Sequence, residues 1–163
     1  MAKIYIAQTK HNGKGIFTDS NIKKDEIIME FKGNLINYKE TKKYRYFEDH
    51  CLQIDENLYI GPDGKEDDFI NHSCNPNYFV KINDKRAFLI GLKNISKGEE
   101  ITYDYSTTLD EDDWEMDCNC KESICRKRVR DFKYLPKKLQ QKYIKLNIIP
   151  DFITKTTKCN HHQ

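Results

Sequence analysis

Three cysteines stand close together in the second half of the chain, at Cys118, Cys120 and Cys125. Thiolates at this density are typical of zinc, which in structural sites takes four ligands in a closed tetrahedron. The segment is therefore one ligand short, and composition does not choose the fourth. The candidates for that ligand are Cys51, Cys74, Cys159, His161 and His162.

A second group of chemically capable side chains lies between residues 68 and 77. The consecutive residues Asn71, His72, Ser73 and Cys74 place an amide, an imidazole, a hydroxyl and a thiol between apolar segments. Such density rarely serves packing alone, so the segment is a candidate site. The alternative is a buried loop in which Asn71 and His72 only hydrogen-bond the backbone.

Two tyrosines follow the turn that begins at Gly98. Tyr103 and Tyr105 are two residues apart in a run typical of a strand, so their rings should share one face. From spacing alone we expect two core tyrosines whose hydroxyls are hydrogen-bonded.

A glycine pair, Gly13 and Gly15, flanks Lys14 and leads into an apolar strand segment. Because a strand follows rather than a helix, the pair lacks the context of a dinucleotide- or phosphate-binding loop. Glycine here either makes a turn with positive φ or leaves the backbone bare for a ligand.

The elements that must position these residues are mostly short strands. β-branched and aromatic residues recur in short blocks separated by Gly, Asn and Asp turns, which predicts a mainly β domain. The predicted strands are Ile4–Ile6, Ile16–Phe17, Ile27–Phe31, Leu52–Ile54, Leu58–Ile60, Phe79–Ile82, Phe88–Leu92 and Ile101–Tyr105.

Helices are expected in two places. One covers Tyr38–Phe47, and a C-terminal one begins at Pro136, a residue favoured in the first turn of a helix. Apolar spacing predicts one shared face on the C-terminal helix. The residues of this face are Leu135, Leu139, Tyr143 and Leu146.

The composition limits the class of protein. The chain has 163 residues, enough for one core, and 28 basic residues nearly balance 26 acidic ones. No apolar run approaches the roughly 20 residues of a membrane helix, and Met1–Gln8 lacks the apolar centre of a secretory signal. We therefore expect an intracellular protein, cytoplasmic, nuclear or delivered into a host cell, whose grouped thiols bind metal rather than form disulfides.

The near balance of charge hides a local division. Asp110–Asp117 holds six acids and no base, whereas Cys118–Lys145 holds ten bases and two acids. A basic segment of this kind binds nucleic acid in some proteins, but more often it is an ordinary solvated face. Nucleic acid therefore ranks below a protein as the primary ligand, and nothing indicates a membrane partner.

Taken together, these segments resemble the SET-domain protein-lysine methyltransferases with a cysteine-rich post-SET extension. The resemblance covers about Ala2 to Arg130 and depends on order and spacing: a glycine pair, Asn-His-Ser-Cys-x-Pro-Asn, Gly-Glu-Glu-Ile-Thr-Tyr-Asp-Tyr, then Cys-x-Cys-x₄-Cys. It implies a fold of small curved sheets with a C-terminal pseudoknot, a zinc-bound post-SET segment and a short C-terminal helix.

The resemblance also assigns roles by position. It implies that the backbone of Lys14, Gly15 and Ile16 contacts S-adenosylmethionine, and that Asn71 and His72 hold this cofactor. Tyr105 falls on the catalytic tyrosine, and Tyr103 falls on the position that tunes how many methyl groups are added. The implied ligands of a structural Zn²⁺ are Cys74, Cys118, Cys120 and Cys125.

The resemblance divides the chain into three parts: a SET domain over 2–108, an acidic connector with the post-SET zinc segment over 109–130, and a basic helical tail over 131–163. Two departures concern the substrate. Many relatives carry a tyrosine where this chain has His50, and the segment between Ile54 and Asn71 is too short for the long insert of some members. Specificity is then expected from a compact groove.

The function expected from the sequence is S-adenosylmethionine-dependent protein-lysine N-methylation of a basic protein segment, with a histone as one candidate. Two alternatives from other classes stay open. One is a catalytically silent SET-like interaction module, and the other is a small zinc-dependent nucleic-acid-binding protein built on the basic tail.

Overall fold

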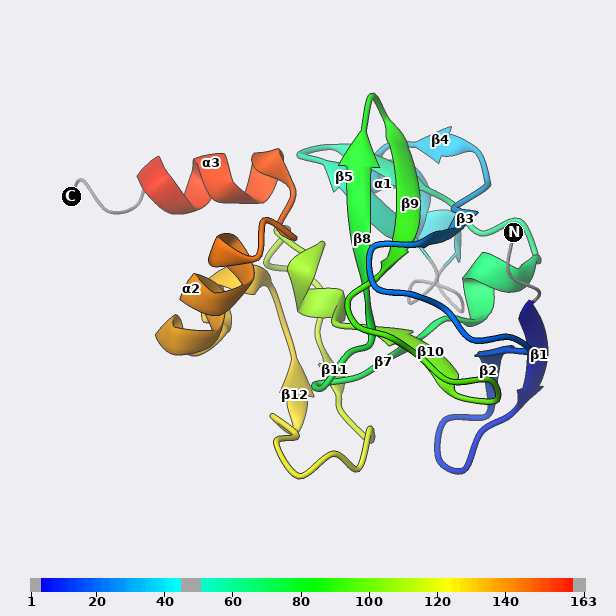
Figure 1. Cartoon of the computed structure of the whole chain (residues 1–163). Helices are drawn as coiled ribbons and strands as arrows, with labels where there is room; N and C mark the ends of the chain where they lie inside the picture. Colours follow the sequence, from blue (N-terminus) through cyan, green and yellow to red (C-terminus); the bar gives the residue numbers. More distant parts are fainter. Residues whose placement is uncertain (1–3, 45–50, 160–163) are drawn as a thin grey trace.

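The computed structural model describes residues 4–44 and 51–159, with side chains described as far as residue 155. Short strands form small curved sheets, and helices α2 and α3 lie together at one end (Figure 1). The mainly β fold expected from the sequence is confirmed. In the described ranges no helix is long and apolar enough to cross a membrane.

The largest sheet has the order β1-β2-β10-β8-β9-β3, and β7 also pairs with β10. Its pairing of β10 with β7 is parallel and brings Asn71 beside Thr102 and His72 beside Tyr103. Two motifs about thirty residues apart in sequence therefore lie side by side. The strands are β1 Ile4–Gln8, β2 Lys14–Thr18, β3 Ile27–Glu30, β7 Asn71–His72, β8 Tyr78–Asn83, β9 Arg86–Gly91 and β10 Glu100–Tyr103.

Two smaller sheets complete the β structure. One has the order β4-β6-β5, from Leu35–Ile36, Leu58–Ile60 and Leu52–Asp55. In the other, β11 (Met116–Asp117) pairs with β12 (Arg128–Val129) around the cysteine-rich segment. Strands β4, β7, β11 and β12 were not expected from the sequence, because two residues are too few to show a hydrophobic period.

The first predicted helix is confirmed as far as Tyr44. Helix α1 (Tyr38–Thr41) continues into a 3-10 turn, Lys42–Tyr44. It begins with a capping box in which Asn37 accepts from the Glu40 amide and the Glu40 carboxylate accepts from the Asn37 amide. The rest of the predicted helix lies outside the described residues.

The C-terminal segment folds into α2 (Lys137–Lys145) and α3 (Asp151–Cys159) rather than a single helix. The chain leaves α2 at Asn147, which has a φ of +54°. Leu135 and Tyr143 are buried as expected. Leu146 is 46% exposed, because it is the C-cap residue, where the helix ends, so its place on the buried face was predicted wrongly.

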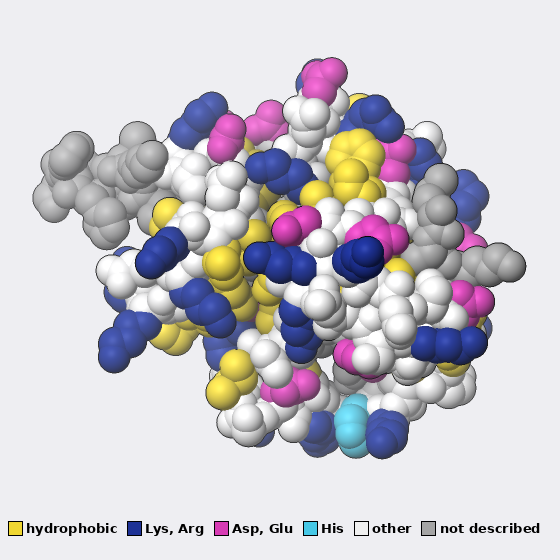
Figure 2. Space-filling model, viewed as in Figure 1, with side chains coloured by type: hydrophobic (Ala, Val, Ile, Leu, Met, Phe, Trp, Pro, Cys, Tyr) yellow, Lys and Arg dark blue, Asp and Glu magenta, His cyan; other side chains and the backbone are white. Residues whose placement is uncertain are grey.

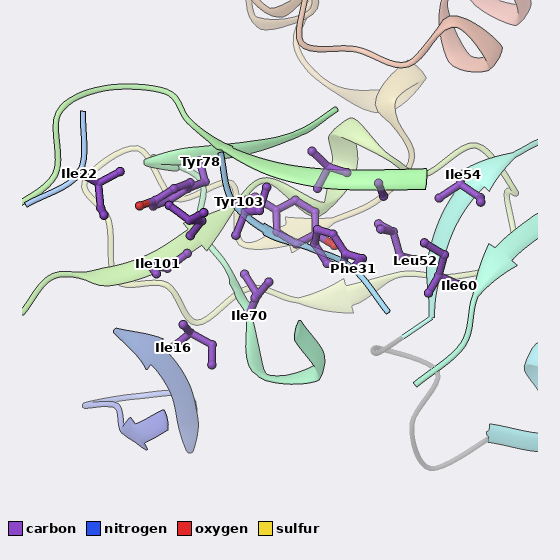
Figure 3. Close-up of a cluster of buried hydrophobic side chains, with 14 of the residues drawn as sticks. Ile16, Ile22, Phe31, Leu52, Ile54, Ile60, Ile70, Tyr78, Ile101 and Tyr103 are labelled. Carbon is purple, nitrogen blue, oxygen red and sulfur yellow. The ribbon is translucent and has the colours of Figure 1, made fainter. Parts of the chain in front are cut away.

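The main core lies between the sheets and holds Tyr103 with its ring edge against Phe31, 6.3 Å between centroids (Figure 3). Most of its members come from the predicted strand blocks. Labelled members are Ile16, Ile22, Leu52, Ile54, Ile60, Ile70, Tyr78 and Ile101.

A second core joins the C-terminal helices to the sheet. Side chains of the C-terminal segment pack against Phe79 and Ile82 of β8 and against Leu92. Its buried members are Phe132, Leu135, Tyr143, Ile148, Ile149, Phe152 and Ile153. Residues 131–153 are therefore packed onto the β structure rather than extended away from it.

Candidate active site and cysteine cluster

The tyrosine pair lies where β10 ends. Tyr103 is the last residue of the strand, and Tyr105 begins a 3-10 turn, so the predicted strand is two residues too long. The rings nevertheless meet, with centroids 4.8 Å apart. The Tyr105 hydroxyl donates to the Ile70 carbonyl at 2.6 Å, and its backbone N–H donates to Nδ1 of His72 at 3.1 Å.

His72 is buried beside this pair, with 4% of its surface exposed. Because Nδ1 accepts the Tyr105 N–H, the ring proton belongs on Nε2, which lies 3.4 Å from Sγ of Cys74. Burial lowers the pKa of His72 to about 4, so the imidazole is neutral near pH 7. His72 thus links the tyrosine pair to the cysteines without adding positive charge.

Asn71 crosslinks the glycine-rich strand to β10. Its amide nitrogen donates to the Lys14 carbonyl at 3.0 Å and to Oε1 of Glu100 at 2.8 Å. A Cβ on Gly15 would lie 2.8 Å from that amide nitrogen and 2.6 Å from Oε1 of Glu100, so only glycine fits. The bare backbone at Gly15 therefore admits these two side chains, while Gly13 makes the expected turn with a φ of +71°.

Two pockets meet at Tyr105. The first, here called the motif pocket, is lined by both sequence motifs and the cysteine segment, and includes Asn12, Asn71, His72, Tyr105, Met116 and Asn119. The second, the aromatic pocket, includes Tyr59, Tyr103, Tyr105, Trp114, Glu111 and Asp113. Lys14 and Gly15 lie behind Asn71, and the side chain of Ile16 is in the core.

The aromatic pocket carries negative charge. Glu111 accepts a hydrogen bond from the Tyr59 hydroxyl at 2.5 Å, and burial together with this contact raises the pKa of Tyr59. Asp113 pairs with the exposed Lys42 at 3.1 Å. The centroid of the Trp114 ring lies 6.4 Å from that of Tyr105. Part of the acidic segment is therefore built into the pocket.

The rest of that acidic segment points elsewhere. Asp112 accepts from Lys133 at 2.5 Å and from the Tyr134 hydroxyl at 2.8 Å, so the C-terminal segment neutralises it. The sequence pattern treated all these acids alike, because no signal in it separates the acids that line the pocket from Asp112, which bonds the 3-10 turn Phe132–Tyr134.

Four cysteines converge next to the motif pocket. The sulfurs of Cys74, Cys118, Cys120 and Cys125 all lie within 4.8 Å of one another, and Cys74 and Cys118 are 3.7 Å apart. Tetrahedral zinc with bonds of about 2.3 Å requires sulfurs about 3.8 Å apart, so the four thiols fit this ion. Cys51 lines the aromatic pocket instead.

The environment of the cysteine cluster also suits a cation. The backbone N–H groups of Arg126 and Lys127 donate to Sγ of Cys74 and Cys125, both at 3.4 Å. Burial raises the pKa of the Cys74 thiol to about 11. A thiophilic cation would therefore be needed to keep all four sulfurs deprotonated near pH 7. Of the other candidate ligands, Cys159 has no described side chain and His161 and His162 lie outside the described residues.

Sequence reasoning gave no role to Asp104, which stands between the two tyrosines and is 1% exposed. Its Oδ1 accepts from the Arg126 guanidinium at 2.7 Å and from the Ser106 N–H at 3.2 Å, and its Oδ2 accepts from the Tyr143 hydroxyl at 3.1 Å. His50, the other notable position in the sequence, lies outside the described residues.

Comparison with known proteins identifies the class. The sequence model of the SET domain matches residues 13–106, more than half of the chain, so this chain belongs to the SET-domain family. Among curated relatives, the histone-lysine N-methyltransferase trithorax of Drosophila virilis is 33% identical over 128 residues. The match covers 71% of this chain and 3% of that much longer protein.

Solved structures show the same fold. The crystal structure of KRYPTONITE in complex with mCHG DNA and SAH aligns with a TM-score of 0.66 at 24% identity, over 79% of this chain and 29% of that one. KRYPTONITE in complex with mCHH DNA, H3(1-15) peptide and SAH aligns with a TM-score of 0.62 at 24% identity, over 80% and 30%.

Proposed function

We propose that this SET-domain protein is an S-adenosylmethionine-dependent protein-lysine N-methyltransferase that acts on a basic protein segment. One observation carries the proposal: Tyr105 lines both the motif pocket and the aromatic pocket. A methyl donor in one pocket and a lysine side chain in the other would meet at its hydroxyl. The histone-lysine methyltransferase relatives support the same reaction class.

The motif pocket is assigned to the cofactor. Two aligned structures contain SAH, which is S-adenosylmethionine without its transferable methyl group. Asn71 and His72 line the pocket, and Asn71 holds the backbone of Lys14 and Gly15, which continues to Ile16, the third residue assigned to the cofactor. A neutral His72 fits a ligand with a positive sulfonium, because it adds no charge repulsion. When bound, the cofactor supplies a methyl carbon that leaves sulfur and joins the lysine nitrogen.

The aromatic pocket is assigned to the substrate lysine. Free lysine has a pKa near 10.4, so its nitrogen must lose a proton before it can attack. The rings of Tyr59, Tyr103, Tyr105 and Trp114 line the pocket, and desolvation against such rings disfavours the ammonium form. Glu111 and Asp113 attract the cation on approach.

Tyr105 is proposed to orient the amine rather than deprotonate it. Its own proton is donated to the Ile70 carbonyl at 2.6 Å, so its oxygen is left as an acceptor for an amine N–H. Holding the nitrogen in line with the methyl group supplies much of the rate, since alignment of reacting atoms is worth about 7–11 kcal/mol.

The cysteine cluster is assigned to a structural Zn²⁺ held by Cys74, Cys118, Cys120 and Cys125. Cys118 and Cys120 themselves line the motif pocket together with Met116 and Asn119. The metal would therefore fix one wall of the cofactor pocket and take no part in methyl transfer.

The substrate class follows from the charge of the aromatic pocket. A segment rich in lysine and arginine suits the carboxylates of Glu111 and Asp113, and a histone H3 tail is the first substrate to test. The bound H3(1-15) peptide in an aligned KRYPTONITE structure supports this choice.

The test combines SAH calorimetry with transfer of a radiolabelled methyl group. We expect SAH to bind, and we expect label on an H3 tail peptide but not on the same peptide with every lysine changed to arginine. SAH binding without transfer to histones or total cell lysate would favour the silent interaction module. A chain that binds no SAH would favour the zinc-dependent nucleic-acid binder.

A further inference from the structure

Helix α2 carries a set of lysines that the proposed reaction does not use. Lys137, Lys138, Lys142 and Lys145 are all exposed, and at about 100° per residue they fall within an arc of about 140°. We call this arc the α2 lysine face. Figure 2 shows Lys and Arg side chains gathered over the part of the surface formed by α2.

The packing of α2 on the second core does not require lysines on the α2 lysine face. The opposite side of α2 is the one that packs: Gln140 and Tyr143 are buried, and Leu139 contacts the second core. The Gln140 amide donates to the Leu135 and Lys133 carbonyls, which fixes the start of the helix. The lysine side chains therefore point away from the sheet and are free to meet a partner.

The charges also work against the helix itself. Lys137 and Lys138 occupy its first turn, where the helix dipole favours acids, and no acid is present there. Lys138 and Lys142 are four residues apart, and Lys142 and Lys145 are three apart, so like charges are neighbours. A surface selected for stability alone would alternate lysine with glutamate.

Neighbouring basic residues are neutralised, whereas these four are not. Lys133 pairs with Asp112, and both Arg128 and Arg130 contact Glu115. Between residues 132 and 150 the chain has five lysines and no acid, although the whole chain has 28 bases and 26 acids. In the part of the chain that the structure describes, no carboxylate forms an ion pair with the α2 lysine face.

We propose that the α2 lysine face binds the phosphate backbone of double-stranded nucleic acid, without reading its sequence. The four lysines span about 12 Å along the helix axis, which matches three to four phosphate steps of one strand. Lysine is a flexible point charge that suits phosphates, while base recognition uses planar, forked groups. The inference goes beyond methyl transfer and does not depend on it.

A membrane surface fits this helix less well. A helix that lies on a bilayer needs an apolar face to insert. Leu139 and Tyr143 of α2 are already used by the second core, and Gln141 lies among the lysines. Only Ile144 and the C-cap residue Leu146 are apolar and exposed along the helix, too few to form an inserting face.

The test measures binding of the full zinc-loaded chain to a fluorescent 20-base-pair duplex of arbitrary sequence. Four phosphate contacts predict a slope of about −3.6 in log affinity against log salt, or roughly a 100-fold loss between 50 and 200 mM salt. Changing Lys137, Lys138, Lys142 and Lys145 to Gln should weaken binding at least tenfold at 50 mM salt and flatten the slope. Changing the same four to Arg should keep the affinity within about threefold.

A matched control removes the same charge elsewhere. Lys10, Lys23, Lys24 and Lys97 are exposed and lie outside α2, and changing them to Gln should cost less than threefold in affinity. Equal losses in the two Gln variants would overturn the proposal, as would a wild-type chain that binds no duplex. Preferential binding to phosphatidylserine vesicles would overturn it in favour of a membrane. SAH affinity should be unchanged and the unfolding temperature should not fall in any variant, which shows that all of them fold.

Discussion

Tyr143 of α2 donates a hydrogen bond to Oδ2 of Asp104 at 3.1 Å, inside the core and 39 positions along the chain. Asp104 stands between Tyr103 and Tyr105, and its other oxygen accepts from Arg126 of the cysteine-rich segment. One buried carboxylate thus joins the tyrosine pair, the cysteine segment and the C-terminal helices. The division at residues 108 and 130 stays a prediction, but these contacts cross both boundaries.

The first prediction tests that bond. Tyr143→Phe removes one hydroxyl and leaves Oδ2 of the buried Asp104 without this donor, so the free energy of unfolding should fall by about 1–3 kcal/mol. Urea denaturation measures the change. Tyr134→Phe is the control, because its hydroxyl bonds Asp112 on an exposed surface, and it should cost less than about 0.5 kcal/mol. If both variants lost the same free energy of unfolding, the buried Tyr143–Asp104 bond would stabilise the fold no more than the exposed one.

The sequence predicted some features around Asp104 and missed others, and the difference has a physical cause. A period of two placed Tyr103 and Tyr105 together, and their rings do meet although the strand ends at Tyr103. A helical period placed Tyr143 on a buried face. Neither period could pair Tyr143 with Asp104, because that contact depends on how α2 packs across the sheet. Two-residue strands such as β7 also carry no periodic signal.

The second prediction concerns zinc. Cys74→Ser should lower bound zinc well below one ion per chain, because it removes a ligand of the four-sulfur cluster. Cys51→Ser should leave one ion, since Cys51 lines the aromatic pocket. Elemental analysis of the two purified variants measures the number of zinc ions per chain. Chelation should also weaken SAH binding, because Cys118 and Cys120 line the motif pocket, and SAH affinity that survives complete zinc removal would contradict this link.

The third prediction separates chemistry from cofactor binding. Tyr105→Phe should lower kcat at least about 100-fold and leave the SAH dissociation constant within twofold, because the hydroxyl acts mainly in the transition state. Asn71→Ala should instead weaken SAH about 5- to 30-fold, because it removes two hydrogen bonds, to the Lys14 carbonyl and to Glu100, that hold the wall of the motif pocket. Single-turnover kinetics and calorimetry measure the two effects. A Tyr105→Phe variant with near wild-type turnover would remove Tyr105 from its role.

The fourth prediction concerns the charge of the aromatic pocket. Changing Glu111 to Gln and Asp113 to Asn should raise the KM for a Lys/Arg-rich peptide and flatten its dependence on salt. Asp112→Asn is the control of the same charge type, and it should leave the KM unchanged because Lys133 and Tyr134 hold Asp112 away from the pocket. If all these variants raised the KM alike, the acidic segment would act only through its total charge.

The last prediction concerns the product. Burial raises the pKa of Tyr103, so its hydroxyl stays protonated, and the ring is fixed between Phe31 and Tyr105. A hydroxyl held beside the lysine nitrogen can hydrogen-bond the amine and oppose the rotation that brings a methylated nitrogen back in line. The wild-type enzyme should therefore stop at mono- or dimethyl-lysine.

Mass spectrometry of exhaustive reactions measures this end point. Tyr103→Phe should let a higher methylation state accumulate on the same peptide, because it removes the hydroxyl and keeps the ring. Tyr78→Phe is the matched control: Tyr78 is likewise a core tyrosine, and among the described residues its hydroxyl has no hydrogen-bond partner, so its loss should leave the product unchanged. Trimethyl-lysine as the wild-type end product would refute the restraint at Tyr103, because a hydroxyl that limits rotation cannot coexist with full methylation of the same nitrogen.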